Sequence, residues 1–319
     1  MRRAEPDFLV IGAPKAGTTA LHASLALHPQ LFLSAVKEPK YFLSDGAPPN
    51  GATGGGGPGD RQTHGEHIWD PTAYAALFTD APAASVRGEA TPFYLHDLAA
   101  QRRIAAALPA VKCIAVVREP VDRAYSNWAH LRSAGLEDIP DFVAACRAQD
   151  ARRAMGWAPF WHYVDLGLYG RQVTHLFSLV DPERVLLIRY RDLHDEPVAT
   201  LDRVCAFLGV QTGLLGGVRE ENVRPFVAPG PVNDALGTLL RAGAGVGHRF
   251  PPSWRVAART PLLRALHREQ ARKPQLSDEQ WPAVAPRFAA DVDELTRVTG
   301  TFFEDWHSPP STRPRRRVR

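Results

Sequence analysis

The chain contains little lysine and little cysteine, and both shortages are informative. It has 319 residues, of which 38 are Lys or Arg, but only five of these are lysine. Arginine is therefore the default cation here, and each lysine raises the question of what its compact charge does. Cys113, Cys146 and Cys205 are far apart and lie in apolar contexts. They exclude a disulfide framework and predict buried thiols in a reducing compartment.

Long hydrophobic runs and metal-ligand spacings are also missing. The first apolar run, after Asp7, is about five residues long, far below the roughly 20 residues of a membrane-spanning helix. The 12 histidines show no spacing typical of a zinc site. We therefore expect a soluble, cytoplasmic protein with no membrane span and no metal.

A globally basic surface is lacking as well. The net charge is +4, but residues 311–319 alone contain five arginines and no acidic residue. The rest of the chain is close to neutral, which argues against a nucleic-acid partner. We expect residues 1–305 to form a single domain and residues 306–319 to form a basic, disordered tail.

The order of apolar segments predicts an α/β fold. Residues 7–12 form a continuous apolar run that ends in glycine, and residues 19–27 follow with helical spacing. Further strands are expected at residues 85–88, 111–117 and 184–188, at intervals that suit βαβ crossovers. The pattern predicts a three-layer fold like that of P-loop NTPases, with a central parallel sheet and a helical C-terminal elaboration.

Two regions are expected to vary around this sheet. Residues 46–59 are dominated by Gly, Pro, Ala and Asn, a composition typical of a mobile loop. Residues 225–298 begin rich in Gly and Pro and continue as helical, Arg-rich sequence. The sequence contains no repeat that would indicate a second domain.

The glycine loop at residues 12–19 (Gly-Ala-Pro-Lys-Ala-Gly-Thr-Thr) has the glycine spacing of a Walker A motif, but its lysine is displaced. A P-loop NTPase has lysine directly after the second glycine, where this chain has Thr18. Backbone amides at a helix start still attract an anion. The loop therefore predicts anion binding with a differently placed charge, at Lys15.

A second anion site is predicted after the strand at residues 111–117. A Walker B strand would end in an aspartate that holds Mg²⁺. Here Arg118 follows the strand, and Ser126 lies within the helix that Pro120 starts. Arginine and a hydroxyl suit a second phosphate, since arginine binds phosphate through two parallel hydrogen bonds.

Together these segments resemble a known family. Residues 8–19 resemble the 5′-phosphosulfate loop of sulfotransferases that use 3′-phosphoadenosine 5′-phosphosulfate (PAPS), and residues 117–126 resemble their 3′-phosphate segment. Residues 37–42, 88–95 and 185–193 are similar to the carbohydrate, heparan-sulfate-like branch and its bacterial relatives. The matches run in order from about residue 7 to residue 208. The resemblance implies transfer of a sulfuryl group from PAPS, in line and without a metal, to an acceptor hydroxyl.

The resemblance also implies roles for individual residues. Lys15 would stabilise the leaving phosphate, and Glu38 would act as the general base. The PAPS-binding residues would be Lys15, Ala16, Gly17, Thr18, Thr19, Arg118, Ser126, Asn222 and Arg224. The acceptor would face Lys37, Lys40, Glu89, Thr91 and Tyr94.

Other interpretations remain open at this point. Residues 37–40 also fit a solvated charged turn, Thr18 and Thr19 could be helix caps only, and residues 222–224 fit a plain loop. The family's carbohydrate enzymes often have lysine where this chain has Ala90, so a small molecule or glycolipid suits the acceptor better than a strongly anionic polysaccharide. A P-loop small-molecule kinase and a non-catalytic nucleotide-binding scaffold are the alternative functions.

Overall fold

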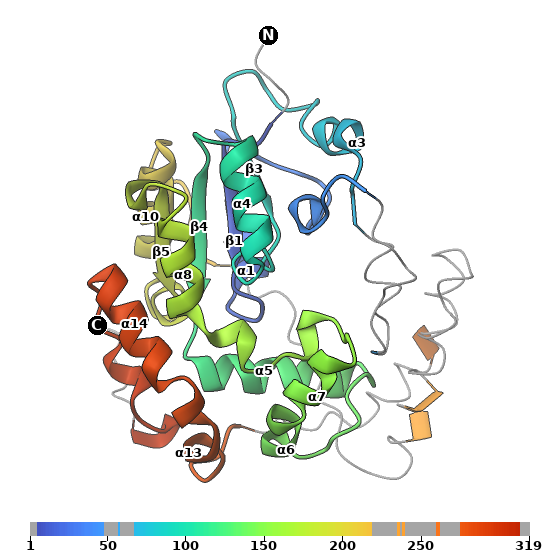
Figure 1. Ribbon diagram of the computed structural model, residues 1–319. Coiled ribbons are helices and arrows are strands. Elements are labelled where there is room, and N and C mark those ends of the chain that lie inside the picture. The colour runs from blue at the N-terminus through green and yellow to red at the C-terminus, as the bar shows by residue number, and fades with distance from the viewer. Residues whose placement is uncertain are drawn as a thin grey trace.

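A computed structural model describes residues 5–47, 57, 67–218, 235–236, 238–239, 260–261 and 275–312 of the protein. Its centre is a five-stranded parallel sheet with the order β2-β3-β1-β4-β5 (Figure 1). The strands are β1 (Phe8–Gly12), β2 (Leu31–Leu33), β3 (Val86–Ala90), β4 (Lys112–Val117) and β5 (Val185–Arg189). The predicted α/β fold with a parallel sheet is confirmed.

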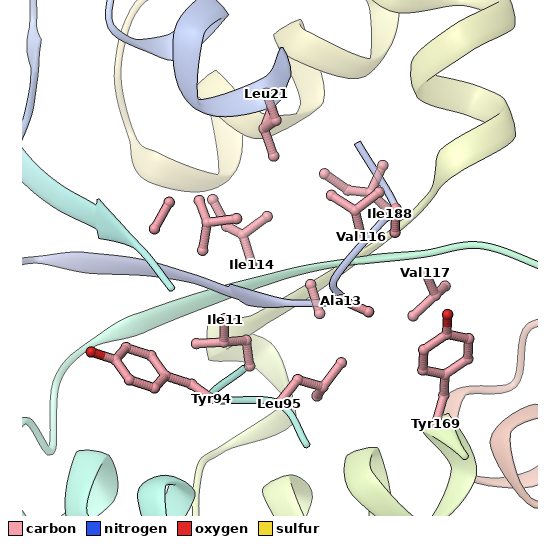
Figure 2. Close-up of a cluster of buried hydrophobic side chains, with 14 of the residues drawn as sticks. Ile11, Ala13, Leu21, Tyr94, Leu95, Ile114, Val116, Val117, Tyr169 and Ile188 are labelled. Carbon is pink, nitrogen blue, oxygen red and sulfur yellow. The ribbon is translucent and has the colours of Figure 1, made fainter. Parts of the chain in front are cut away.

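The central strands are apolar because both faces of the sheet are covered. Every residue of β1 is buried, as are the last five of β4. Leu21 lies on one face of the sheet, while Tyr94, Leu95 and Tyr169 lie on the other (Figure 2). Parallel strands buried on both faces are expected to be nearly continuous apolar runs, and this is why the sequence revealed them.

The helices that cover and extend the sheet follow the predicted alternation. In the first part of the chain they are α1 (Thr18–Leu25), α3 (Pro71–Ala76), α4 (Leu98–Ala107) and α5 (Pro120–Ser133). Next come α6 (Phe142–Arg147), α7 (Gln149–Ala154), α8 (Tyr169–Phe177), α9 (Tyr190–Asp195) and α10 (Pro197–Leu208). The last are α13 (Gln280–Val284) and α14 (Ala289–Thr299).

Short 3₁₀ turns join several of these elements. They are η1 (Tyr41–Leu43), η2 (Pro159–Trp161), η3 (Asp165–Gly167), η4 (Pro182–Arg184), η5 (Ala285–Arg287), η6 (Glu304–Trp306) and η7 (Pro310–Thr312). The predicted loop at residues 46–59 lies outside the described residues except at positions 46, 47 and 57. Most of the predicted helical region before residue 275 also lies outside them.

Strand order predicts a ligand-binding position at the carboxyl edge of the sheet. The chain passes from β1 to β2 on one side, and from β4 to β5 on the other. In open α/β sheets such a reversal leaves a crevice between the carboxyl ends of the two strands, where ligands bind. The reversal here falls between β1 and β4, and α5 runs across this edge (Figure 1).

The C-terminal helices pack onto the domain through specific bonds. Asp291 of α14 accepts hydrogen bonds from the Gly170 and Arg171 amides at the start of α8, at 2.7 and 2.9 Å. Glycine is required at position 170, because a Cβ there would lie 2.2 Å from the Asp291 carbonyl oxygen. The C-terminal helix α14 therefore caps α8 and sits directly against it.

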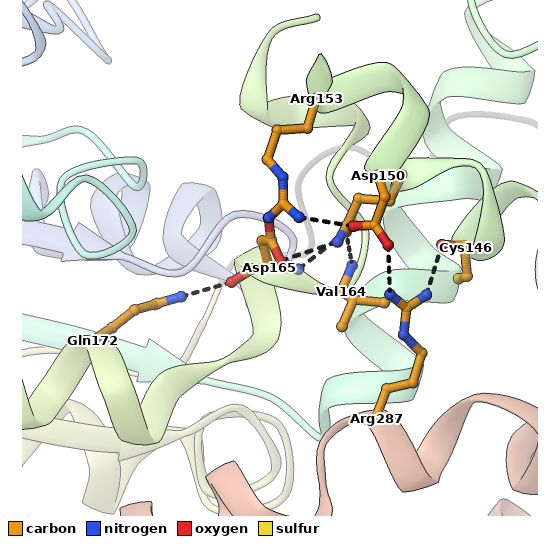
Figure 3. Close-up of polar contacts among 8 residues, drawn as sticks. Cys146, Asp150, Arg153, Val164, Asp165, Gln172 and Arg287 are labelled. Atoms are coloured by element: carbon orange, nitrogen blue, oxygen red, sulfur yellow. Dashed lines mark hydrogen bonds and ion pairs between the residues drawn. The ribbon is translucent and has the colours of Figure 1, made fainter. Parts of the chain in front are cut away.

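A second contact joins the C-terminal part to α6 and α7. Arg287 of η5 donates to the carbonyl of Cys146 at 2.8 Å and lies 4.0 Å from the Asp150 carboxylate (Figure 3). Asp150 also pairs with Arg153, which reaches Asp165 at 2.8 Å. These polar contacts fix the region that packs against α5.

The predicted disordered tail from residue 306 is wrong in its first part. Trp306 is buried, and its ring packs on Phe303 with 4.3 Å between ring centroids. Asp305 forms ion pairs with Arg189 and Arg191 at the end of β5. Apolar and charged anchors outweigh the basic composition up to residue 312, and residues 313–319 lie outside the described residues.

Candidate functional site

The glycine loop lies at the carboxyl end of β1, as its sequence predicts. Gly12 closes the strand, and a Cβ at this position would lie 2.5 Å from Leu95 Cβ. The Ala13 amide donates to the Val116 carbonyl at 2.7 Å, and the Ala16 amide donates to the Ala13 carbonyl at 3.1 Å. The loop is therefore held against β4 and turns tightly before α1.

Two residues of this loop have left-handed backbone conformations. Lys15 has φ 68° and Gly17 has φ 93°. A non-glycine residue with positive φ is uncommon, and such strain is concentrated at functional sites. Thr18 and Thr19 form the first turn of α1, where amides have no carbonyl partner within the helix. The loop can therefore present N–H groups and the Lys15 ammonium to one anion.

Arg118 meets this loop from β4. It follows the last residue of the strand, and its Nη1 atom donates to the Lys15 carbonyl oxygen at 3.4 Å. Its guanidinium carbon also lies 4.7 Å from the centre of the Tyr190 ring, a cation–π arrangement. The two predicted anion sites thus share the crevice between β1 and β4.

The start of α5 already carries a carboxylate. Glu119 caps the helix by accepting from the Asp122 amide at 2.6 Å, and it accepts from Trp281 Nε1 at 3.2 Å. A second anion is therefore not expected on the helix N-terminus itself. Arg118 and Ser126 are the candidate ligands, and Ser126 is buried on the second turn of α5.

The segment 37–42 joins the site from the neighbouring strand. The Glu38 amide donates to the Ala90 carbonyl at the end of β3, at 3.0 Å. Lys37 Nζ forms an ion pair with Glu38, and both side chains are partly exposed. Glu38 and Lys40 both have φ 60°, so this turn is strained twice within three residues. The structure brings the lysine and carboxylate of the predicted catalytic segment into contact.

Lys40 differs from Lys37 in its surroundings. It is buried, with 7% of its surface exposed, whereas the Lys37 side chain is 26% exposed. The Lys40 amide donates to Thr91 Oγ1 at 3.3 Å. An acceptor in solution would therefore reach Lys37 more readily than Lys40, and the contact of the acceptor with Lys40 stays a prediction.

The prediction that Glu89, Thr91 and Tyr94 face the acceptor needs correction. Each of the three has an exposed fraction of 0%. Thr91 Oγ1 and the Tyr74 hydroxyl donate to the Glu89 carboxylate at 2.9 and 3.3 Å, and the Tyr94 hydroxyl bonds to it as well. Glu89, Thr91, Tyr74 and Tyr94 are called the Glu89 cluster below. This cluster lies behind segment 37–42, since its residues accept bonds from that segment's backbone.

Burial changes the acidity of the Glu89 cluster. Desolvation raises the pKa of Glu89 from 4.5 to about 7, the hydroxyl hydrogen bonds oppose this shift, and the nearby Glu38 charge adds to it. Burial and the Glu89 charge raise the pKa of Tyr74 and of Tyr94 well above 10. The two tyrosines therefore stay protonated as donors, while Glu89 titrates near neutral pH.

This shift predicts a pH dependence of stability. A carboxyl with a folded-state pKa near 7 and an unfolded value of 4.5 binds more protons when folded. Glu89 should therefore lower the free energy of unfolding as the pH rises from about 4.5 to about 7, by up to about 3 kcal/mol. Denaturant unfolding of wild type and Glu89→Gln at several pH values would measure it. Other groups titrate in both proteins, so the difference between them isolates Glu89, and a pH-independent difference would contradict the prediction.

Two residues of the site were not singled out as site residues by the sequence analysis. Tyr190 begins α9 and lies against both Arg118 and Gly17, where a Cβ would come within 3.0 Å of its ring. Tyr190 falls within segment 185–193, and the similarity of this segment to the family was the sequence signal that could have identified it. Tyr74 comes from α3, outside every motif, and no sequence signal pointed to it. The predicted residues Asn222 and Arg224 lie outside the described residues.

The described residues offer neither a metal site nor a membrane span. They contain no group of three or more His, Cys, Asp or Glu side chains placed to hold a metal ion. None of their helices is both long and apolar enough to cross a membrane. The three cysteines are free and buried, and burial raises the pKa of Cys113 and Cys146 to about 12. These two thiols are therefore poor nucleophiles.

Comparison with known proteins places this geometry in context. Residues 89–228 match the family model described as a sulfotransferase domain. Human heparan sulfate glucosamine 3-O-sulfotransferase 6 is 30% identical over 211 residues, which cover 66% of this chain and 54% of the relative. Mouse bifunctional heparan sulfate N-deacetylase/N-sulfotransferase 4 is 29% identical over 220 residues, covering 64% of this chain and 22% of the relative. The chain thus spans about half, or less, of the length of these curated relatives.

A solved structure extends the likeness to the whole fold. The sulfotransferase from Alicyclobacillus acidocaldarius superposes with a TM-score of 0.73 at 24% identity, covering 95% of this chain and 99% of that one. The three-layer architecture predicted from the sequence agrees with this neighbour. The glycine loop and segment 37–42 lie before residue 89, so they are outside the family-model match and depend on the geometry described above.

Proposed function

This chain belongs to the sulfotransferase family, and on that premise we propose that it transfers a sulfuryl group from PAPS to an acceptor hydroxyl. One observation carries the proposal. Arg118, which directly follows β4, donates a hydrogen bond to the Lys15 carbonyl oxygen of the glycine loop, so the two predicted anion sites lie next to each other. A donor with two separate phosphate-type charges suits this pair of cationic sites.

The residues present fit such a donor. The α1 amides of Thr18 and Thr19, with Ala16 and Gly17 before them, would surround the 5′-phosphosulfate. Arg118 would bind the 3′-phosphate through two N–H groups, and Ser126 would add a hydroxyl. Asn222 and Arg224, which lie outside the described residues, would complete the nucleotide site. Gly17 lies close to the Tyr190 ring, so a larger residue would narrow this part of the crevice.

Glu38 and Lys15 would perform the chemistry. The Glu38 carboxylate would take the proton of the acceptor hydroxyl as its oxygen forms a bond to sulfur. The bond between sulfur and the bridging phosphate oxygen breaks, and the Lys15 ammonium would stabilise the charge left on that oxygen. The Lys37 ammonium forms an ion pair with the Glu38 carboxylate and would help to orient it.

The acceptor would be a small molecule, a glycolipid or a carbohydrate with a free hydroxyl. Lys37 is the partly exposed cation next to Glu38 and would contact an acidic group on the acceptor. The named relatives act on heparan sulfate, as their names state. For this chain the acceptor class remains part of the proposal. The buried, free cysteines suit a reducing compartment, so we place the reaction in the cytoplasm.

A calorimetric titration tests the proposal against the two alternatives. We expect adenosine 3′,5′-diphosphate to bind more tightly than ATP with Mg²⁺, since Arg118 stands where a P-loop kinase has a magnesium-binding aspartate. Preference for ATP with Mg²⁺ would favour the kinase. Tight binding of adenosine 3′,5′-diphosphate, with no sulfated product from PAPS and a panel of phenolic, steroid and glycoside hydroxyls, would favour the scaffold.

Arg118→Ala should chiefly weaken donor binding. Loss of charge-assisted hydrogen bonds to phosphate costs about 1.5–3 kcal/mol, which corresponds to a Kd for adenosine 3′,5′-diphosphate raised about 10-fold to 100-fold. Titration calorimetry measures the change. Arg102→Ala is a matched control, because Arg102 lies on α4 and contacts His175 at 3.2 Å. Equal affinity of the Arg118 variant and the wild type would remove Arg118 from the donor site.

A further inference from the structure

Glu89 is a buried carboxylate to which the proposed reaction gives no role. It is the fourth residue of β3, beside β1, and none of its surface is exposed. Its partners are three hydroxyl groups, on Thr91, Tyr74 and Tyr94. Buried carboxylates are costly, and their presence calls for a structural or functional reason.

Hydrogen-bond donors and acceptors in the Glu89 cluster can be counted. An ionised carboxylate only accepts, so each hydroxyl must turn its one proton towards Glu89. The lone pairs of Thr91 Oγ1 and Tyr94 Oη are then free to accept from elsewhere. They accept from the Lys40 and Phe42 amides, each at 3.3 Å. Glu89 thus sets the direction of two hydroxyls that bind the backbone of segment 37–42.

Segment 37–42 needs this support because its backbone is strained. Glu38 and Lys40 both have φ 60°. A non-glycine residue in this region costs energy and persists only where its surroundings hold it. The hydrogen bond from the Glu38 amide to the Ala90 carbonyl holds one end of the turn, and the Glu89 cluster holds the other.

We propose that Glu89 is a positioning residue that, through Thr91 and Tyr94, holds the backbone of residues 38–42 and so places the Glu38 carboxylate. The inference rests on the proposed function, because it assigns Glu38 the role of base. Glu89 does not contact the acceptor or the donor. It acts by fixing the directions of the Thr91 and Tyr94 hydroxyl groups, which accept hydrogen bonds from the backbone of the turn.

Glu89→Gln keeps the shape of the side chain but changes its hydrogen bonding. Glutamine has one acceptor oxygen and an NH₂ group that donates, so it cannot accept from all three hydroxyls as the carboxylate does. We expect kcat to fall about 10-fold to 100-fold, since a misplacement of about 1 Å can cost that much, while the Kd for adenosine 3′,5′-diphosphate stays within about 2-fold. The Lys40 and Phe42 amides should exchange with deuterium faster, as measured by mass spectrometry.

The pH profile separates positioning from a merely structural role. The groups facing Glu89 are Tyr74 from α3, Thr91 and Tyr94 after β3, and Glu38 from the turn. The tyrosines stay protonated, so Glu89 is the member whose charge changes near pH 7. In the wild type, kcat should fall as the pH drops through about 7. A protonated Glu89 donates a hydrogen bond, so it no longer accepts from all three hydroxyls and no longer fixes their directions. In Glu89→Gln this limb should be absent.

Thr91 supplies a second test if Glu89→Gln folds poorly. Thr91→Val has nearly the same shape but no hydroxyl, and we expect a similar loss of kcat and faster Lys40 exchange. Thr91→Ser restores the hydroxyl and should rescue both. Tyr74→Phe is the matched control: it removes one bond to Glu89 but none to segment 37–42 among those described, so its Lys40 and Phe42 exchange should stay near that of the wild type.

The outcomes distinguish this inference from the proposed function. Suppose that the wild type transfers the sulfuryl group, and that Glu89→Gln and Thr91→Val have the same kcat and the same amide exchange as the wild type. This result would overturn the role of Glu89 and leave the proposed function intact. A wild type without transfer activity would overturn the proposed function. The exchange measurements would then still show whether the Glu89 cluster holds the turn.

Discussion

A Lys15→Ala variant is expected to lose sulfuryl transfer, with kcat lowered about 10²-fold to 10³-fold, the typical cost of removing one group that stabilises developing negative charge. Lys15 lies in the loop between β1 and α1 and has φ 68°. Alanine has a similar preference against this conformation, so the backbone strain should change little. Single-turnover kinetics with PAPS and an acceptor identified by product screening would measure the loss.

Lys15→Arg sharpens this prediction because it retains the charge. The guanidinium is planar and wide, whereas the lysine ammonium is a compact point charge. We expect most of the activity to be lost, in a chain with only five lysines among its 38 Lys and Arg residues. Near-normal activity of Lys15→Ala would show that another group contacts the leaving oxygen, whereas near-normal activity of Lys15→Arg would show that any cation at this position suffices.

Lys112→Ala is the matched lysine control. Lys112 lies at the start of β4, away from the carboxyl edge, where its Nζ donates to the Phe207 carbonyl at 2.6 Å. Its loss should leave kcat unchanged and lower the free energy of unfolding by about 1 kcal/mol. A fall in kcat here would mean that lysine removal acts through general destabilisation.

Glu38→Gln should lower kcat about 10²-fold to 10⁴-fold, the range that general base catalysis contributes. The substitution keeps the hydrogen bond from the residue 38 amide to the Ala90 carbonyl, but the glutamine side chain cannot take up a proton from the acceptor. Donor binding should stay within about 2-fold of the wild type, because Glu38 is assigned to the acceptor side. Steady-state kinetics and calorimetry together measure the split.

Lys37→Ala is the informative companion to Glu38→Gln. It breaks the ion pair with Glu38 but leaves the base in place. We expect a smaller loss of kcat, together with a higher KM if the acceptor is acidic. A Glu38→Gln variant with wild-type kcat would exclude Glu38 as the base and leave residues 37–40 as a charged turn.

The parts of the fold that were predictable are those with strong local patterns. Strands β1 and β4 are continuous apolar runs, and Pro120 marks the start of α5, so each was located to within one or two residues. Strand β2 has only three residues, two of them half-buried, and its pattern is too short to recognise. Trp306 is buried and packs near Tyr169, with 5.9 Å between the ring centroids, a contact between distant parts of the sequence that composition does not reveal.

The site residues also separate into those that local sequence patterns predict and those that they do not. Lys15 and Arg118 lie in short motifs after the recognisable strands β1 and β4, where topology fixes their neighbourhood. Glu38 follows the short strand β2, and its amide bonds to the Ala90 carbonyl at the end of β3, so all three lie at one edge of the sheet. Glu89, Thr91 and Tyr94 lie in an equally clear motif, but the motif does not show which way a side chain points. Tyr74, which α3 brings from another part of the chain, donates a hydrogen bond to Glu89 within this buried cluster.

The carboxylate of Glu119 has a consequence for where this protein can be cut. One oxygen caps α5, next to Arg118, and the other accepts from Trp281 in α13, so α13 helps to hold the region around the proposed nucleotide site. The family match stops at residue 228, and a shortened chain designed from that boundary would lack Trp281. The folded unit around this site is therefore longer than the segment that matches the family model.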